Sequence, residues 1–84
     1  MTAYQRKILK DIAEATYSRN YCEQKAWEFA SMREDSTTAM DYLESVKSWN
    51  GWIETLRKLA NEEKLTEKQI NNAIDKYHKA MQEG

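Results

Sequence analysis

The chain of 84 residues contains no proline, and of its two glycines only Gly51 lies away from the last position. Tight β-turns rely on these two residue types, because proline presets φ and glycine accepts a positive φ. A chain almost without them has little material for strands joined by hairpins. We therefore expect an all-α fold, a compact bundle of three to four helices with a C-terminal antiparallel helix hairpin.

The chain length allows a single helical domain, residues 1–84, with one modest core and no deep active-site cavity. Aliphatic residues are scarce, and three Trp, five Tyr and four Met stand in their place, so we expect a core rich in aromatic rings. The 13 basic and 14 acidic residues give a net charge of −1. This balance argues against a dedicated duplex-DNA binder and against an acidic mimic of nucleic acid.

Apolar residues at spacings of three and four predict helices over residues 3–15, 20–33 and 39–61, and a last helix after residue 65. Residues 16–20 are middling or poor helix formers, so we expect a break or kink there. If the first two helices merge, three remain. The residues on the apolar stripes form the expected core: Ile8, Ile12, Phe29, Tyr42, Leu43, Val46, Trp49, Ile53, Leu56, Ile70, Ile74 and Tyr77.

The third of these helices carries a heptad-like stripe from Tyr42 to Ala60 that crosses Asn50 and Gly51 without losing its phase. Asn-Gly is also a common turn signal, and a helix end at that point is the competing interpretation. Because the apolar phase survives, we favour one long helix. Before it, residues 35–38 prefer caps and turns and predict the clearest interior loop.

The start of the last helix has the most specific local signal. Thr66 and Gln69 form an S/T-x-x-E/Q capping box, and Leu65 and Ile70 occupy the two positions of a hydrophobic staple around it. The loop over residues 61–64 is short. We therefore expect the last two helices to be antiparallel neighbours.

Groups that could carry catalysis are sparse. His78 is the single histidine, so no pair of histidines can bind a metal ion, and Cys22 has no second cysteine for an internal disulfide. Gly51 alone cannot form a glycine-rich phosphate loop. We expect no enzymatic activity, no cofactor and no metal site. The cysteine content and the lack of a long apolar run predict a cytoplasmic protein that does not enter the membrane.

The aromatic residues are more numerous than one thin core easily hides. Trp and Tyr are enriched at the hot spots of protein interfaces. The candidates for binding a larger protein partner lie at the edge of a stripe or at a predicted helix start: Tyr17, Tyr21, Trp27 and Trp52. The competing interpretation places all four in or around the core.

Basic residues suggest two alternatives to a larger protein partner. Arg6, Lys7 and Lys10 cluster near Tyr4, and Arg19 lies between two tyrosines, a mixture that can bind single-stranded nucleic acid by phosphate contact and stacking. The competing interpretation is that these are ordinary solvated faces. The long stripe of the third helix could also seat a homodimer.

The segment from Trp52 to Tyr77, with Leu65-Thr66-Glu67-Lys68-Gln69 at its centre, resembles the helix–LSEKQ–helix tail of phage and mobile-element proteins of nucleic-acid metabolism. The resemblance implies a small phage-type accessory protein in the host cytoplasm, and it implies no catalytic residue. Our leading hypothesis is a non-enzymatic adaptor or inhibitor that binds a host or phage protein of nucleic-acid metabolism or defence. The alternative is a single-stranded nucleic-acid-binding accessory protein.

Overall fold

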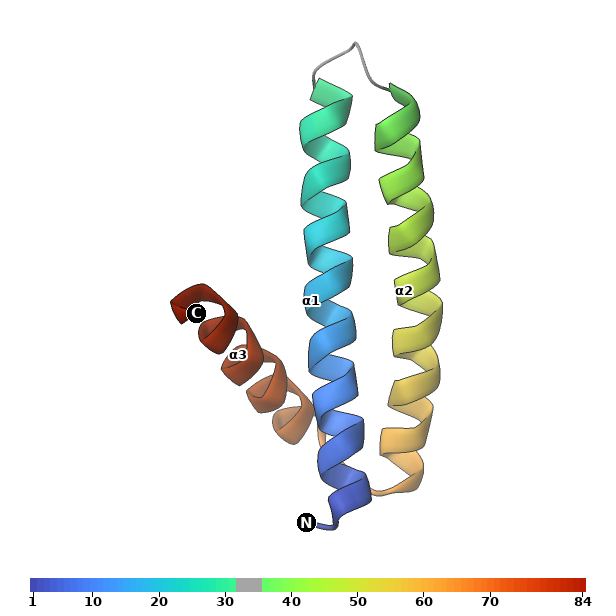
Figure 1. Cartoon of the computed structure of the whole chain (residues 1–84). Coiled ribbons are helices and arrows are strands. Elements are labelled where there is room, and N and C mark those ends of the chain that lie inside the picture. The colour runs from blue at the N-terminus through green and yellow to red at the C-terminus, as the bar shows by residue number, and fades with distance from the viewer. Residues whose placement is uncertain (32–35) are drawn as a thin grey trace.

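The computed structural model of the chain describes residues 1–31 and 36–84, and its helices are α1 (Ala3–Ser31), α2 (Ser36–Glu62) and α3 (Glu67–Glu83). None of the described residues lies in a strand, which confirms the all-α bundle. Figure 1 shows α1 and α2 side by side and antiparallel, with α3 beside the end of α1 that carries the N-terminus. The molecule is a long helical hairpin with a shorter third helix at one end.

The break expected at residues 16–20 is wrong, because α1 is continuous through them. Weak helix propensity costs at most about 0.7 kcal/mol at each such position, and tertiary packing outweighs it. Tyr17 packs edge-on against Tyr77 of α3, with 5.7 Å between the ring centroids. An ion pair of 3.2 Å between Arg19 and Glu23 supports the next turn. The first two expected helices are therefore one.

Helix α2 passes through Asn50 and Gly51 without interruption, which confirms one long helix. Gly51 faces open space, since nothing lies within 4 Å of the position that a Cβ would take there. The helix starts at Ser36, so the loop expected over residues 35–38 is wrong from Ser36 onward. Ala39 is buried in the first turns and anchors this end of α2 against α1. Residues 32–35, which include the predicted end of the second helix, lie outside the described residues.

The capping box at the start of α3 is confirmed. The Thr66 hydroxyl oxygen accepts from the Gln69 backbone N–H at 3.2 Å, and the Gln69 side chain accepts from the Thr66 N–H at 2.8 Å. Leu65 and Ile70 are both buried, as the hydrophobic staple predicts. Lys64, just before them, adopts a left-handed φ of 60°. These residues fix where α3 begins and turn the chain away from the axis of α2.

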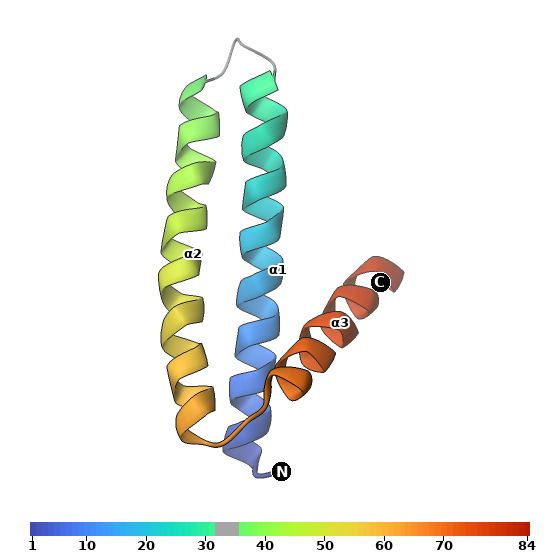
Figure 2. The ribbon, with the colours of Figure 1, turned by 180° about the vertical axis from the view of Figure 1, so that it is seen from behind.

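The expected antiparallel hairpin of the last two helices is not formed, because α3 packs against α1 rather than α2. Figure 2 shows the connection after α2 crossing the base of α1 before α3 begins. Leu65 and Ile70 join Leu9 of α1 in the core. The side-chain amide of Gln5 also donates to the backbone oxygen of Glu63 at 3.0 Å. The apolar face of α1 therefore sets the place of α3, which loop length alone could not predict.

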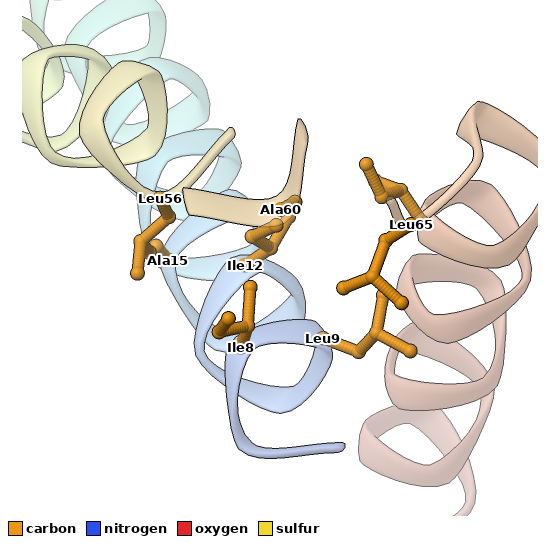
Figure 3. Close-up of a cluster of buried hydrophobic side chains, with 8 residues drawn as sticks. Ile8, Leu9, Ile12, Ala15, Leu56, Ala60 and Leu65 are labelled. Atoms are coloured by element: carbon orange, nitrogen blue, oxygen red, sulfur yellow. The ribbon is translucent and has the colours of Figure 1, made fainter. Parts of the chain in front are cut away.

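The core lies at the base of the hairpin, where α1, α2 and the connection to α3 meet (Figure 3). It consists of Ile8, Leu9, Ile12, Ala15, Leu56, Ala60, Leu65 and Ile70. Trp49, Ile53 and Ile74 are half-buried against it. Aliphatic side chains and alanines thus fill the core, and aromatic rings border it, contrary to the aromatic-rich core that we expected. Leu43, also expected in the core, is exposed.

We call the other end of the hairpin, residues 21–31 and 36–46, the tip. No third helix lies beside it (Figure 1), and its buried apolar residues in the described part are Ala26 and Ala39. The radius of gyration is 14.8 Å, against roughly 12 Å for a globular domain of this length. The accessible surface is 6267 Å², against roughly 5,200 Å² for a typical folded monomer of this mass. At the tip, the side of the hairpin that α3 covers at the base is therefore exposed to solvent.

Candidate functional site

Three large apolar side chains project from the tip into solvent. Trp27 on α1 is 71% exposed, and Met40 and Leu43 on α2 are 64% and 54% exposed. Exposed apolar surface forfeits roughly 25 cal/mol per Å² that burial would gain. Clusters of such side chains on a soluble domain mark interaction sites. Whether these three form a cluster depends on the faces of α1 and α2 that carry them.

Trp27 lies on the face of α1 that α3 covers further down. Residues seven apart on an α-helix differ by only about 20° around its axis. Trp27 is seven residues after Asn20, whose amide donates to His78 of α3 at 3.4 Å. It is also fourteen residues after Ala13, which lines a groove together with Ala73 of α3. Trp27 therefore continues the α3-facing stripe past the end of α3.

Leu43 lies on the corresponding side of α2. It is fourteen residues before Arg57, which forms an ion pair with Glu67 at the start of α3. Nη1 of Arg57 and Oε1 of Glu67 are 2.9 Å apart. By the same periodicity, Leu43 shares the face of α2 that is turned toward the start of α3. Met40, one turn before Leu43, borders the same face.

The stacked rings of Phe29 and Tyr42, with centroids 5.7 Å apart, show how α1 and α2 pair at the tip. Because the helices are antiparallel, Trp27 and Leu43 are at nearly the same level, each within two residues of that stack. They therefore lie side by side on one side of the hairpin. We call this surface the tip patch, and it consists of Trp27, Ala30, Met40 and Leu43.

The tip patch offers apolar contact and no reactive group. Its large members supply an indole ring, a thioether and a branched alkyl chain. The indole ring suits the role of a binding anchor, and the flexible thioether suits an adaptable rim. Glu23 lies one turn before Trp27, and Lys47 lies one turn after Leu43, so a charge of each sign borders it. Such border charges orient a partner more than they add affinity. The arrangement can bind another apolar surface.

The structure does not bring all four sequence-predicted partner-binding residues together. Tyr17 is half-buried and holds α3 on α1 through its contact with Tyr77. Tyr21 is exposed one turn further on, with Nζ of Lys25 5.7 Å from its ring centroid. Tyr21 is six residues before Trp27, and this spacing places the two side chains about 120° apart around α1. Of the aromatic residues on α1, Trp27 alone belongs to the tip patch.

Trp52 defines a separate surface. It is nine residues after Leu43, a spacing that places it on the opposite face of α2. Trp52 and Trp49 line a shallow trough of about 350 Å³ whose floor is formed by α1. Asp11 and Glu14 border this trough, and both already pair with lysines of α1. The trough therefore lies outside the tip patch.

The basic residues proposed for nucleic-acid binding are engaged along α1 itself. Their partners are Asp11 for Lys7 (3.2 Å), Glu14 for Lys10 (3.9 Å), Glu23 for Arg19 (3.2 Å) and the backbone oxygen of Met1 for Arg6 (3.0 Å). Arg6 and Arg19 are also thirteen residues apart, which is roughly 20 Å along a helix. The four cations therefore do not form one continuous patch.

His78 and Lys25 have structural partners. The ring of His78 accepts from the Asn20 amide and donates to a backbone oxygen of its own helix at 2.8 Å. Glu28 raises the pKa of Lys25 through a hydrogen bond and through its charge. Cys22 is half-buried with a free thiol. Within residues 1–31 and 36–84, no three His, Cys, Asp or Glu side chains gather to hold a metal ion.

The length and apolar content of the described helices decide whether any of them could span a membrane. No helix that the structure describes is long and apolar enough to span a membrane.

Sequence reasoning missed Met40 and assigned Leu43 to the core. The signal was present in the spacing, because Leu43 is one residue after Tyr42 and therefore about 100° away from the stripe that faces α1. The exposure of Met40 depends on the length and direction of α3, which leave this side of the tip uncovered. No local pattern contains that information.

Comparison of the chain with protein-family models, with curated proteins and with solved structures finds no match. The resemblance of the C-terminal segment to phage-protein tails therefore stays a prediction.

Proposed function

We propose that the protein is a non-enzymatic adaptor or inhibitor that binds one larger protein stoichiometrically through the tip patch. The observation that carries this proposal is the position of Trp27, which is 71% exposed beside Leu43 where α3 no longer covers the hairpin. The resemblance of residues 52–77 to phage-protein tails suggests a phage-encoded protein whose partner belongs to nucleic-acid metabolism or defence.

The tip patch has the features of an interface core. Full burial of one large apolar side chain contributes about 1.5–3 kcal/mol, and the patch presents three such side chains. A partner helix laid along the patch would take the place that α3 holds at the base, which is the helix-in-groove mode of recognition. Trp27, the most exposed of the three large side chains, would be the hot spot, since Trp is strongly enriched at such positions.

Single-stranded nucleic acid is the weaker candidate. Lys7 and Arg19 each pair with a carboxylate one turn away at 3.2 Å, and Lys10 lies 3.9 Å from the carboxylate of Glu14. The four described residues of the patch are apolar, and Lys47 at its border is a single cation. The geometry thus favours an apolar protein surface over a polyanion.

The test is an affinity capture with quantification of bound proteins by mass spectrometry, with and without nuclease. The baits are the native chain, Trp27→Ser, Leu43→Ser and the matched control Tyr4→Ser. Tyr4 is 50% exposed on α1 but lies at the base. We expect one stoichiometric partner that survives nuclease and is recovered unchanged by the control. Each tip variant should lose it by about thirtyfold, the effect of a hot-spot residue worth 2 kcal/mol or more.

Two results would remove the proposal. Equal recovery of the partner by the native chain and by both tip variants would show that the patch is not the interface. Recovery that disappears with nuclease would move the function to nucleic-acid binding. Circular dichroism of each bait checks that helicity is unchanged, so a lost partner reports on the surface.

A further inference from the structure

A second feature of the molecule, independent of the tip patch, is an apolar groove between α1 and α3 at the base. Figure 1 shows the two helices diverging from their closest point, and a cavity of about 410 Å³ lies between them. Its floor is formed by Leu9 and Ala13 of α1 and by Ala73 and Tyr77 of α3. The alanine side chains fill little of the gap between the two helices, and the groove is largely open to solvent. A volume in this range is typical of small-molecule sites.

The rim of the groove is basic on both sides. Arg6 and Lys10 stand one turn apart on α1, and Lys76 stands across from them on α3. None of the described residues that line the groove is acidic. Lys10 has a carboxylate 3.9 Å away, a long and exposed pair, and Lys76 has no ion-pair partner among the described residues. Arg6 donates one of its N–H groups to the backbone oxygen of Met1 and keeps others for a ligand, and the side chain of Lys10 is 71% exposed. An anion seated at the mouth of the groove can therefore reach donors of all three cations.

Shape and charge together select the occupant. A volume of about 410 Å³ matches one small molecule. Single-stranded nucleic acid needs exposed rings for base stacking, and Tyr77, the one ring in the groove, already packs on Tyr17. An apolar chain on the floor with one anionic head at the rim satisfies both the alanine-lined floor and the cations.

We propose that this groove is a binding site for a medium-chain alkyl carboxylate, with the chain along Leu9, Ala13 and Ala73 and the carboxylate between Arg6, Lys10 and Lys76. The alkyl chain gains by leaving water, and the carboxylate is held by charge-assisted hydrogen bonds at the rim. The site is distinct from the tip patch, so either proposal can stand without the other.

The test is a titration of the isotope-labelled protein followed by amide chemical shifts. The probe is octanoate. As matched controls, 1-octanol carries the same alkyl chain with a neutral head group, and octyltrimethylammonium carries it with a cationic head group. We expect saturable shifts at Leu9, Ala13 and Ala73 with octanoate, and weaker binding of both controls. The variant Ala80→Leu, at the exposed end of the groove, shortens the groove. Exclusion of two methylene groups, at roughly fourfold each, should weaken octanoate binding more than tenfold.

Lys76→Gln tests the rim. Removal of one exposed cation should weaken octanoate binding by about 1.5- to 5-fold, the range of a surface ion pair. Lys47→Gln and Ser48→Leu, at exposed positions of α2 away from the groove, are the matched controls and should leave the affinity unchanged.

Several outcomes would overturn the proposal. These are shifts that do not saturate, shifts centred on the tip patch, and octanol or the cationic amphiphile binding as tightly as octanoate. An oligothymidylate that moves the groove amides where octanoate does not would assign the groove to nucleic acid. Concentration-dependent shifts of these amides without any ligand would assign it to a second copy of the chain.

Discussion

Leu56 and Leu43 lie on the same helix but differ in burial, and the difference defines where the core ends. Leu56 is 2% exposed within the base core, whereas Leu43 is 54% exposed at the tip. The change Leu56→Ala should lower the free energy of unfolding by about 2–5 kcal/mol, through lost burial and the cavity left behind. A chain of this length has roughly 4–13 kcal/mol in total, so the loss is severe.

The same change at Leu43 should be mild. About half of the side chain is already in water, so truncation forfeits about half of the 1.5–3 kcal/mol that full burial of a leucine contributes. The better helix propensity of alanine returns a few tenths. We therefore expect Leu43→Ala to cost about 0.5–1 kcal/mol, several-fold less than Leu56→Ala.

Equilibrium urea unfolding followed by circular dichroism measures both losses, and thermal unfolding gives a second readout. At about 4–8 °C per kcal/mol, Leu56→Ala should lower Tm by roughly 8–40 °C and Leu43→Ala by roughly 2–8 °C. Equal losses at the two positions would refute the reasoning, because Leu43 would then have to be covered in the free protein. Repeating the measurement at two protein concentrations shows whether a second copy covers it.

Three further predictions concern single residues. Gly51→Ala, on an open face of α2, should raise the free energy of unfolding by about 0.5–1 kcal/mol by favouring the helix, and a lower Tm would mean that the face is occupied. Thr66→Ala removes the N-cap of α3 and should lower the free energy of unfolding by about 1 kcal/mol. In a double-mutant cycle with Gln69→Ala the two losses should be coupled, and additive losses would contradict the reciprocal capping box. Glu28→Gln should lower the pKa of Lys25 toward its ordinary value in an NMR titration, and an unchanged pKa would refute the assigned cause. Because that pKa is raised in the folded state, the contribution of the pair is present at neutral pH and is lost as the pH rises past it.

Local chemistry predicted the helix boundaries best where side chains bond the backbone directly. The reciprocal bonds of Thr66 and Gln69 depend on residues three apart, so the start of α3 was readable in the sequence. The unbroken phase of apolar residues likewise predicted the course of α2 through Gly51. Propensity alone was misleading at residues 16–20, where contact with Tyr77, distant in sequence, outweighs it.

Tertiary placement was the part that the sequence could not supply. The stripe that carries Ile70 and Ile74 fits α1 or α2 equally well by pattern, and the choice depends on Leu65 and Leu9 meeting at the base. The tip patch follows from that choice, because α3 ends before it reaches Trp27. Trp27 could be singled out as an aromatic residue off the stripe, but its neighbours could not.

The central claim is that Trp27 contacts a protein partner, and site-specific photo-crosslinking tests it most directly. A benzophenone amino acid replaces Trp27 in one version of the chain and Tyr4, at the base, in the control. After irradiation in the native cell and nuclease treatment, position 27 should give one protein adduct of defined mass and position 4 none. No adduct at position 27, equal adducts at both positions, or adducts to nucleic acid alone would contradict the account.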